Sequence, residues 1–408
     1  MLKINKFILL TQESGFLLPC CLLLLYSMIS GIYKIVDNQA LMALNIPIVL
    51  LLLRKNNVKS MLFQKYDIFF LFYIFYLLFL TVVSLLYSKT NINGVFIGLF
   101  LDIFPIVGFV CSRKMEFKFF LKILLLIAFF HLLIGILLYP PFGIYTSLGS
   151  VAELFVDQML FGRMSSVSGS LAFGNLMMYG CIIAFFYNRK LLPFLLFGLI
   201  FSSQRSSWIG FLLCVLLFTY QNVIAGNRKN LFLLIGVFLL LSISIYFVLL
   251  TFDIDLSFIE YRFSRLSEAG NERTGQWLDG IRNFIDNPIG TGVGQVGHVA
   301  ARYTKDATYR WVADGDYFRI ISEYGIGGLF FYLHFFFFFL CLFFSKLKTK
   351  EEYTIVSLIG ASFIQMIGSN IHEFYFNNFI LWMIVGYFWI LVNNKFKLRV
   401  SSQKMAIN

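Results

Sequence analysis

The stretch that decides the fold class is IFFLFYIFYLLFLTVVSLLY, residues 68–87. These twenty residues carry no charge, and charged residues border them at Asp67 and Lys89. An α-helix rises about 1.5 Å per residue, so roughly twenty apolar residues cross the ~30 Å hydrocarbon core of a bilayer. Residues 68–87 therefore predict a transmembrane helix.

Comparable apolar stretches recur along the 408 residues, which are 59% hydrophobic and 19% aromatic with a mean hydropathy of +0.80. Backbone polar groups inside a bilayer must be satisfied internally, so repeated spans of this length indicate α-helices. We therefore expect one all-α polytopic membrane domain over residues 1–408, with about twelve spans. They are predicted at Phe16–Ile32, Ala40–Leu53, Ile68–Tyr87, Gly94–Val110, Phe117–Leu138, Leu171–Tyr187, Leu191–Ser203, Ser207–Val223, Leu231–Phe252, Tyr317–Phe344, Tyr353–Asn370 and Phe374–Val392.

Basic residues predict the orientation of these spans. Of the 33 Lys and Arg residues, 21 fall on one side of the predicted membrane, together with both termini, and the positive-inside rule makes that side cytoplasmic. Two long segments, residues 139–170 and 253–316, then lie outside. Residues 191–223 form either one long helix or a hairpin. Basic residues on both flanks favour a hairpin that turns at residues 202–206.

The two sides differ in the kind of basic residue. The cytoplasmic side has five Arg and sixteen Lys, whereas the external side has three Lys and nine Arg, namely Arg163, Arg205, Arg262, Arg265, Arg273, Arg282, Arg302, Arg310 and Arg319. A guanidinium binds phosphate or diphosphate through two parallel hydrogen bonds, which an ammonium cannot do. The external face is therefore predicted to hold an anion. The net charge of +12 is largely cytoplasmic and does not indicate nucleic-acid binding.

The longer external segment contains RTGQW at residues 273–277 and NPIGTGVG at residues 287–294. The first motif is predicted to lie in an amphipathic helix over about residues 272–285, which ends before Asn-Pro. Helical spacing puts Arg273 and Trp277 on one face. The glycines allow the backbone to approach a ligand or the membrane surface closely. The alternative is a packed surface helix followed by a flexible loop.

Two further arginines lie in hydroxyl-rich sequences, Arg205 in SSQRSS and Arg163 in GRMSSVSGS. A basic residue among hydroxyls at the membrane boundary suits a phosphate site. The alternative is an arginine that snorkels from a helix end.

Candidate proton acceptors lie close to the same segment. Asp314 and Asp316 precede a predicted span, where they act either as acids at a helix N-terminus or as a general base. His298 follows the glycines, as a base or as a solvated loop residue. His, Asp and Glu do not occur with metal-ligand spacing. The other histidines are expected to be packed or interfacial: His131, His334 and His372.

The order of these motifs over about residues 163–328 resembles the O-antigen polymerase and O-antigen ligase superfamily (Wzy and related proteins). The features that carry the resemblance are an arginine before a middle helix, S-x-R-S at residues 203–206, R-x-x-x-W, N-P-x-G-x-G, and D-x-x-Y with E-x-G-I-x-G entering a helix. The resemblance implies a GT-C-like fold and an inverting glycosyltransferase that uses a lipid-diphosphate donor without a metal or other cofactor. Ligase-like members have a His-Asn pair where this chain has Asp314-Gly315, which favours a polymerase.

By the same resemblance, the protein joins undecaprenyl-diphosphate-linked repeat units of O antigen or capsule at the outer face of the bacterial cytoplasmic membrane. Its partners would be the lipid-linked oligosaccharide, membrane lipids, a chain-length regulator and a flippase. The alternatives are an O-antigen ligase and a flippase or transporter of lipid-linked oligosaccharides. The resemblance implies that Arg205 and Arg273 bind the diphosphate, with secondary contacts from Arg163 and Arg282. Asp314 or Asp316 would accept the proton, and His298 is the next candidate for this role. Trp277 would stack on a sugar ring.

Overall fold

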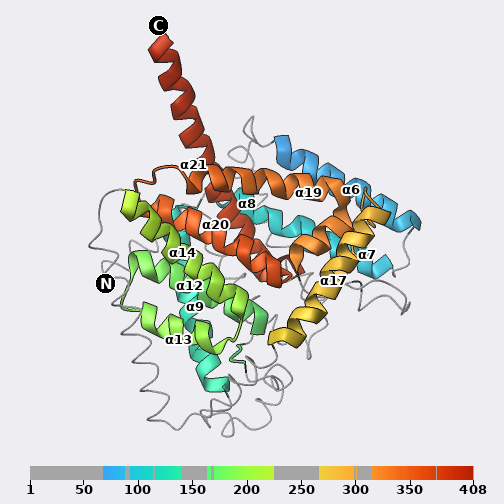
Figure 1. Ribbon diagram of the computed structural model, residues 1–408, viewed down its shortest axis with the longest axis horizontal. Coiled ribbons are helices and arrows are strands. Elements are labelled where there is room, and N and C mark those ends of the chain that lie inside the picture. The colour runs from blue at the N-terminus through green and yellow to red at the C-terminus, as the bar shows by residue number, and fades with distance from the viewer. Residues whose placement is uncertain are drawn as a thin grey trace, which may run out of the picture.

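A computed structural model describes residues 68–87, 92–113, 115–139, 163–166, 170–224, 266–297, 300, 315–373 and 375–407. Every regular element in these ranges is helical (Figure 1). The elements are α6 (Ile68–Tyr87), α7 (Ile92–Ile103), η3 (Phe104–Ile106), α8 (Val107–Cys111), α9 (Phe117–Leu138), α12 (Ser170–Tyr187), α13 (Leu192–Phe201), α14 (Arg205–Ile224), α17 (Leu266–Asp286), α19 (Asp316–Phe343), α20 (Lys350–Gly368), η6 (Ile371–Glu373) and α21 (Tyr375–Ile407).

The prediction of a helical membrane protein is confirmed. Five described helices are long and apolar enough to cross a membrane, at Phe69–Leu86, Phe117–Leu138, Arg205–Val223, Asp316–Phe343 and Phe376–Lys395. The number of twelve spans and the GT-C-like topology stay predictions. Three of the predicted spans lie outside the described residues: Phe16–Ile32, Ala40–Leu53 and Leu231–Phe252.

Two predicted spans differ from simple helices. The span predicted at Gly94–Val110 is divided into α7, η3 and α8, because Pro105 lacks the N–H that an uninterrupted α-helix needs. Residues 191–223 form two helices, as the hairpin interpretation predicts. The chain leaves α13 after Phe201, passes Ser203 at a positive φ of 52° and enters α14 at Arg205.

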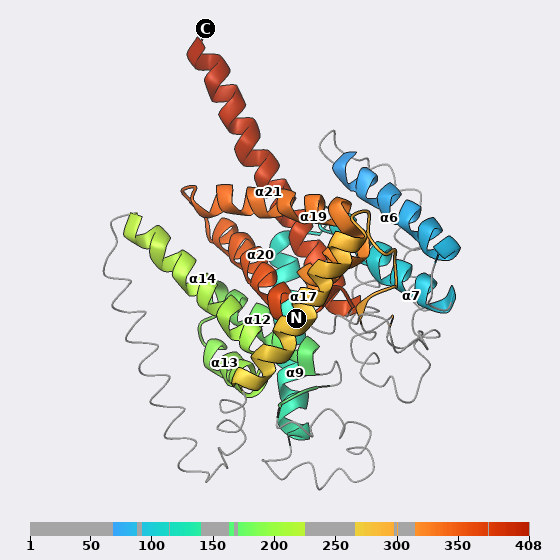
Figure 2. The same cartoon turned by 45° about the vertical axis from the view of Figure 1, so that its right-hand side comes forward.

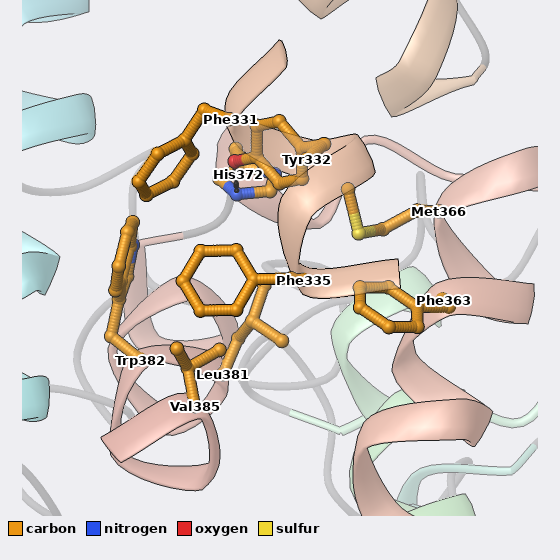
Figure 3. A pocket seen from close by; sticks show the side chains of 9 residues that line it. All are labelled: Phe331, Tyr332, Phe335, Phe363, Met366, His372, Leu381, Trp382 and Val385. Atoms are coloured by element: carbon orange, nitrogen blue, oxygen red, sulfur yellow. Dashed lines mark hydrogen bonds between the residues drawn. The ribbon is translucent and has the colours of Figure 1, made fainter. Parts of the chain in front are cut away.

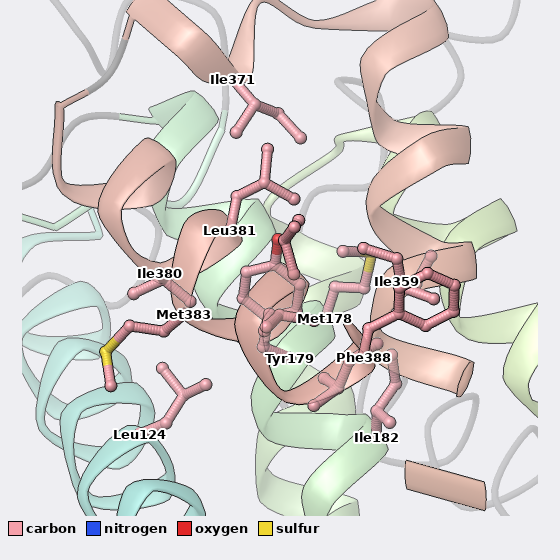
Figure 4. Close-up of a cluster of buried hydrophobic side chains, with 14 of the residues drawn as sticks. Leu124, Met178, Tyr179, Ile182, Ile359, Ile371, Ile380, Leu381, Met383 and Phe388 are labelled. Atoms are coloured by element: carbon pink, nitrogen blue, oxygen red, sulfur yellow. The ribbon is translucent and has the colours of Figure 1, made fainter. Parts of the chain in front are cut away.

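The core is built around α21, in which nearly every residue between 376 and 392 is buried. Figure 4 shows part of this core, including Leu124 of α9, Tyr179 of α12 and Phe388 of α21. Helices in a bilayer associate through close packing, because lipid is as apolar as their side chains. At Gly210 of α14 an added Cβ would lie 3.1 Å from the carbonyl oxygen of Ala361, so only a small residue permits this approach of α14 to α20.

A break in α19 positions the segment after α17. Gly325 has φ 58° and ψ −146°, which bends the helix and frees backbone groups on either side. Ile326 N donates to Pro288 O at 2.8 Å, and Thr291 N donates to Ser322 O at 3.0 Å. Backbone hydrogen bonds therefore hold the segment that follows α17 against the bend of α19 (Figure 2).

Candidate functional site

The candidate site lies where several helix ends meet. The N-terminal residue of α14 is Arg205, and a Cβ added to Gly368, the last residue of α20, would lie 3.4 Å from Cβ of Ser206. A Cβ added to Gly315, just before α19, would lie 3.1 Å from Ile367 O of α20. The positive ends of the dipoles of α14 and α19 are thus brought to the same region, which favours an anion there.

Three of the predicted anion-binding arginines come to this region from separate parts of the chain. Arg273 of α17 lies close enough to Arg205 for their positive charges to repel each other. Met164 N donates to Phe201 O at 2.9 Å, so Arg163 lies beside the turn that leads to Arg205. An anion bound in this region would be attracted by the positive charges of these arginines.

Arg282 lies elsewhere. It is nine residues from Arg273 along α17, which is about half a turn around the helix axis. Its side chain is 64% exposed and pairs with Asp279, with Nη1 3.3 Å from Oδ1. The structure does not bring Arg282 to the other three arginines, and its role in diphosphate binding stays a prediction.

Trp277 borders the site from α17. Its ring stacks on Phe318 of α19 with centroids 4.9 Å apart and an angle of 10° between planes. A Cβ on Gly315 would lie 2.9 Å from Trp277 Nε1, so the indole lies against the start of α19. One face of Trp277 is therefore used for packing, and sugar stacking would need the other face.

Asp316 is buried at the start of α19 and is held by a histidine that the sequence did not single out. His372 N lies 3.2 Å and His372 Nδ1 lies 3.0 Å from Asp316 Oδ2. His372 Nε2 lies 2.5 Å from the hydroxyl of Tyr332. His131 and His334 are packed as expected: His131 Nδ1 lies 2.5 Å from Ser166 Oγ, and the ring of His334 stacks on Phe69.

A signal for His372 was present in the sequence. The polar run SNIHE, residues 369–373, interrupts two apolar spans, and the predicted topology puts that connection on the same side as Asp316. A histidine in a short polar connection beside a candidate base is a more specific pattern than a histidine within a span.

The cavity next to His372 is too small for a substrate (Figure 3). It has a volume of about 10 Å³ and is walled mainly by aromatic and aliphatic side chains, with Tyr332 and His372 at one end. That volume accommodates about one water molecule.

The glycine segment has a structural explanation that the sequence did not give. The carboxylate of Glu323 accepts hydrogen bonds from the backbone N–H groups of Gly294 and Gln295. A Cβ on Gly294 would lie 2.4 Å from the carbonyl oxygen of Gly94 in α7, and φ of Gly294 is 72°. In the structure these glycines allow close packing on protein backbone, and their approach to a ligand or to the membrane surface stays a prediction.

Arg319, one of the nine external arginines, is enclosed by acids. Its guanidinium pairs with Glu323, and it lies 3.5 Å from Asp316 Oδ1 and 3.8 Å from Asp102 Oδ1. All four side chains are almost fully buried. A buried charge needs partners of opposite charge, and Arg319 has them in Glu323, Asp316 and Asp102. Arg319 is therefore not available to bind a diphosphate.

The remaining predicted site residues, Asp314 and His298, lie outside the described residues. The same holds for most of residues 139–170 and for about half of residues 253–316. The membrane side of these two segments stays a prediction.

Residues 191–333 match a family model described as O-antigen ligase. The match runs from the start of α13 into α19, so it includes Arg205, Arg273, Trp277 and Asp316. No curated protein matches the chain. The resemblance to the O-antigen polymerase and ligase superfamily is thereby confirmed over these residues, which are about a third of the chain. Members of that superfamily are membrane glycosyl-transfer enzymes that act on lipid-linked oligosaccharides. The match does not separate polymerases from ligases.

Proposed function

We propose that this protein is a polysaccharide polymerase that joins undecaprenyl-diphosphate-linked repeat units at the outer face of the cytoplasmic membrane. The observation that carries the proposal is that Arg205 and Arg273 lie near each other and Arg163 lies beside the turn that leads to Arg205, where the starts of α14 and α19 both meet the end of α20. Cationic side chains and helix N-termini stabilise the charge that grows on a leaving diphosphate.

The proposed reaction is a single displacement. A hydroxyl of the acceptor repeat unit attacks the anomeric carbon of the donor and forms the new glycosidic bond. The bond between that carbon and the diphosphate oxygen breaks, so undecaprenyl diphosphate leaves with the bonding electron pair. The hydroxyl proton passes to the base. One attack from the face opposite the leaving group inverts the anomeric configuration.

Of the three candidate bases, Asp316 is the one that lies within the described residues. His372 holds its Oδ2 in place, whereas Oδ1 accepts no hydrogen bond from the described residues and has Arg319 Nε at 3.5 Å. Because Asp316 is fully buried, the chain covering it must move before an acceptor hydroxyl can reach Oδ1. Asp314, two residues earlier, stays the second candidate and His298 the third. We propose that the reaction uses no metal.

The ligase is the second candidate function, because the matching family model is described as O-antigen ligase. The two activities differ in the acceptor: a polymerase uses another lipid-linked repeat, and a ligase uses a different molecule. Asp314-Gly315 stands where ligase-like members have His-Asn, and this favours the polymerase.

The decisive experiment uses the purified full chain in proteoliposomes with synthetic undecaprenyl-diphosphate-linked repeat units. A polymerase produces a ladder of lipid-linked products spaced by one repeat unit. A ligase gives no ladder and forms product only when a lipopolysaccharide core acceptor is added. A flippase moves the substrate across the bilayer and forms no new bond. Absence of the ladder under conditions that give core-linked product would reject the polymerase.

A further inference from the structure

Helix α17 has three distinct faces around its axis. One face packs on α19, with Gly280 buried against Phe318. A second face is polar and carries the ion pair between Arg282 and Asp279. The third face is apolar yet exposed, with Leu278 at 47%, Ile281 at 37% and Ile285 at 67%.

A helix that separated only protein from water would need two faces. The third face is apolar over two helical turns, because residues 278, 281 and 285 repeat at three- and four-residue spacing. Contiguous apolar surface of this kind marks contact with another apolar phase.

The apolar face of α17 leads to the lipid-facing surface of two candidate spans. Ile289, just after α17, is 60% exposed, and its carbonyl oxygen accepts a hydrogen bond from the Tyr76 hydroxyl of α6 at 2.8 Å. Pro288 O is bonded to Ile326 N of α19. Around these anchors the exposed side chains of both helices are large and apolar: Phe75, Phe79, Ile326 and Phe330.

The direction of α17 differs from that of the spans around it. In Figures 1 and 2, α17 (gold) runs across α14, α20 and α21 rather than alongside them. It passes the site at which α14 and α19 begin. A helix that lies across the ends of membrane spans lies in the plane of the membrane surface.

We propose that α17 is an interfacial helix whose face formed by Leu278, Ile281 and Ile285 is immersed among the lipid acyl chains of one leaflet. The face with Asp279 and Arg282 meets water, and the third face packs on α19. Amphipathic helices in this position bury their apolar side to a depth of about 5–10 Å. Trp277 then lies at headgroup level, where tryptophan is enriched.

The placement of α17 has a consequence for how the substrate binds. This consequence rests on the proposed function, whereas the placement itself does not. The diphosphate of a lipid-linked substrate lies in the headgroup layer. Arg273 lies about two turns before Gly280 on the side of α17 that faces α19, so the placement of α17 holds Arg273 near headgroup level, where it meets the diphosphate while the polyprenyl chain of the substrate stays in the bilayer.

The test uses single spin-labelled cysteines in a background whose six native cysteines are replaced. Leu278→Cys, Ile281→Cys and Ile285→Cys probe the apolar face, and Asp279→Cys, Arg282→Cys and Asp286→Cys are matched controls on the same helix. Phe330→Cys on α19 sets the value for a lipid-facing position. Each protein is reconstituted in bilayers of phosphatidylethanolamine and phosphatidylglycerol, and the accessibility of the label to oxygen and to a water-soluble nickel chelate is measured.

The proposal predicts high oxygen and low nickel accessibility at 278, 281 and 285, similar to residue 330, and the reverse at 279, 282 and 286. High nickel accessibility at all six positions would place α17 in water and overturn the proposal. Protection of 278, 281 and 285 from both reagents would show a protein cover and also overturn it. The labels report position and not catalysis, so a correctly placed α17 in a protein that makes no polymer would reject only the proposed function.

Discussion

His372 contacts the same carboxylate oxygen of Asp316 through two nitrogens, its backbone N at 3.2 Å and its ring Nδ1 at 3.0 Å. An ionised carboxylate only accepts hydrogen bonds, so Nδ1 carries the proton. Nε2 of the same ring lies 2.5 Å from the hydroxyl of Tyr332. Asp316 Oδ2, the ring of His372 and the hydroxyl of Tyr332 thereby form a buried chain of polar contacts, and Asp316 is fixed at the start of α19.

The first prediction separates proton acceptance from structural support at Asp316. Asp316→Asn keeps a side-chain oxygen that accepts hydrogen bonds from His372, and it removes the carboxylate. If Asp316 is the base, this variant folds normally and elongates repeats about 10²–10⁴-fold more slowly, the usual range for a general base. Asp314→Asn is the parallel variant. Repeat-by-repeat elongation on purified protein measures both, and normal rates in both variants would direct attention to His298.

The second prediction concerns the role of His372. His372→Asn preserves a donor in the place of Nδ1 but has no ring nitrogen that can take a proton, whereas His372→Ala removes the donor. If His372 only positions Asp316, His372→Asn retains most of the elongation rate and His372→Ala loses about tenfold or more, since one lost hydrogen bond to a charged group is worth about 1.5–3 kcal/mol. Equal losses in both variants would show that the imidazole itself is required.

The third prediction uses Arg282 as an internal control for the arginine cluster. Arg205→Lys and Arg273→Lys keep the charge but lose the two-pronged hydrogen bonding to a diphosphate. Both are expected to lose most polymer at normal protein levels, measured as the product ladder. Arg282→Lys is expected to retain polymer, because its side chain is exposed and lies on another face of α17. Loss of polymer in Arg282→Lys alone would contradict this assignment.

A fourth prediction concerns Trp277. Trp277→Phe preserves an aromatic ring to stack on Phe318 and should leave thermal stability nearly unchanged. If the indole also stacks on a sugar, the smaller ring weakens substrate binding. The expected effect is a several-fold rise in KM for the lipid-linked repeat with little change in kcat, consistent with about 0.5–1.5 kcal/mol for a ring contact. An unchanged KM would leave Trp277 with a packing role alone.

The fifth prediction tests the bend of α19. Gly325→Ala forces a Cβ to within 2.3 Å of Pro288 O at φ 58°, so backbone strain and a clash act together. Each effect typically costs about 1–3 kcal/mol. Gly275→Ala is the matched control, because no atom lies within 4 Å of its added Cβ. Thermal unfolding in detergent should show a clear loss of stability for Gly325→Ala and none for Gly275→Ala.

The sequence predicted several of the described membrane helices, because hydrocarbon thickness sets a local requirement. The spans predicted at Ile68–Tyr87 and Phe117–Leu138 coincide with α6 and α9. The amphipathic helix predicted over residues 272–285 lies within α17, and Arg205 begins α14 after the predicted turn. In each case the apolar content of one continuous stretch, or its charged flanks, carries the information.

The pairing of side chains across the site was decided by the tertiary structure. The sequence gives no measure of how each helix is rotated about its axis or of which helix ends meet. For this reason the contact of Asp316 with His372, 56 residues later, was missed, and Arg282 could not be separated from Arg273. The glycines at 290–297 are explained by the carboxylate and the helix backbones that they pack against. Apolar content is a property of a single stretch, whereas a site is a property of helix ends brought together by packing.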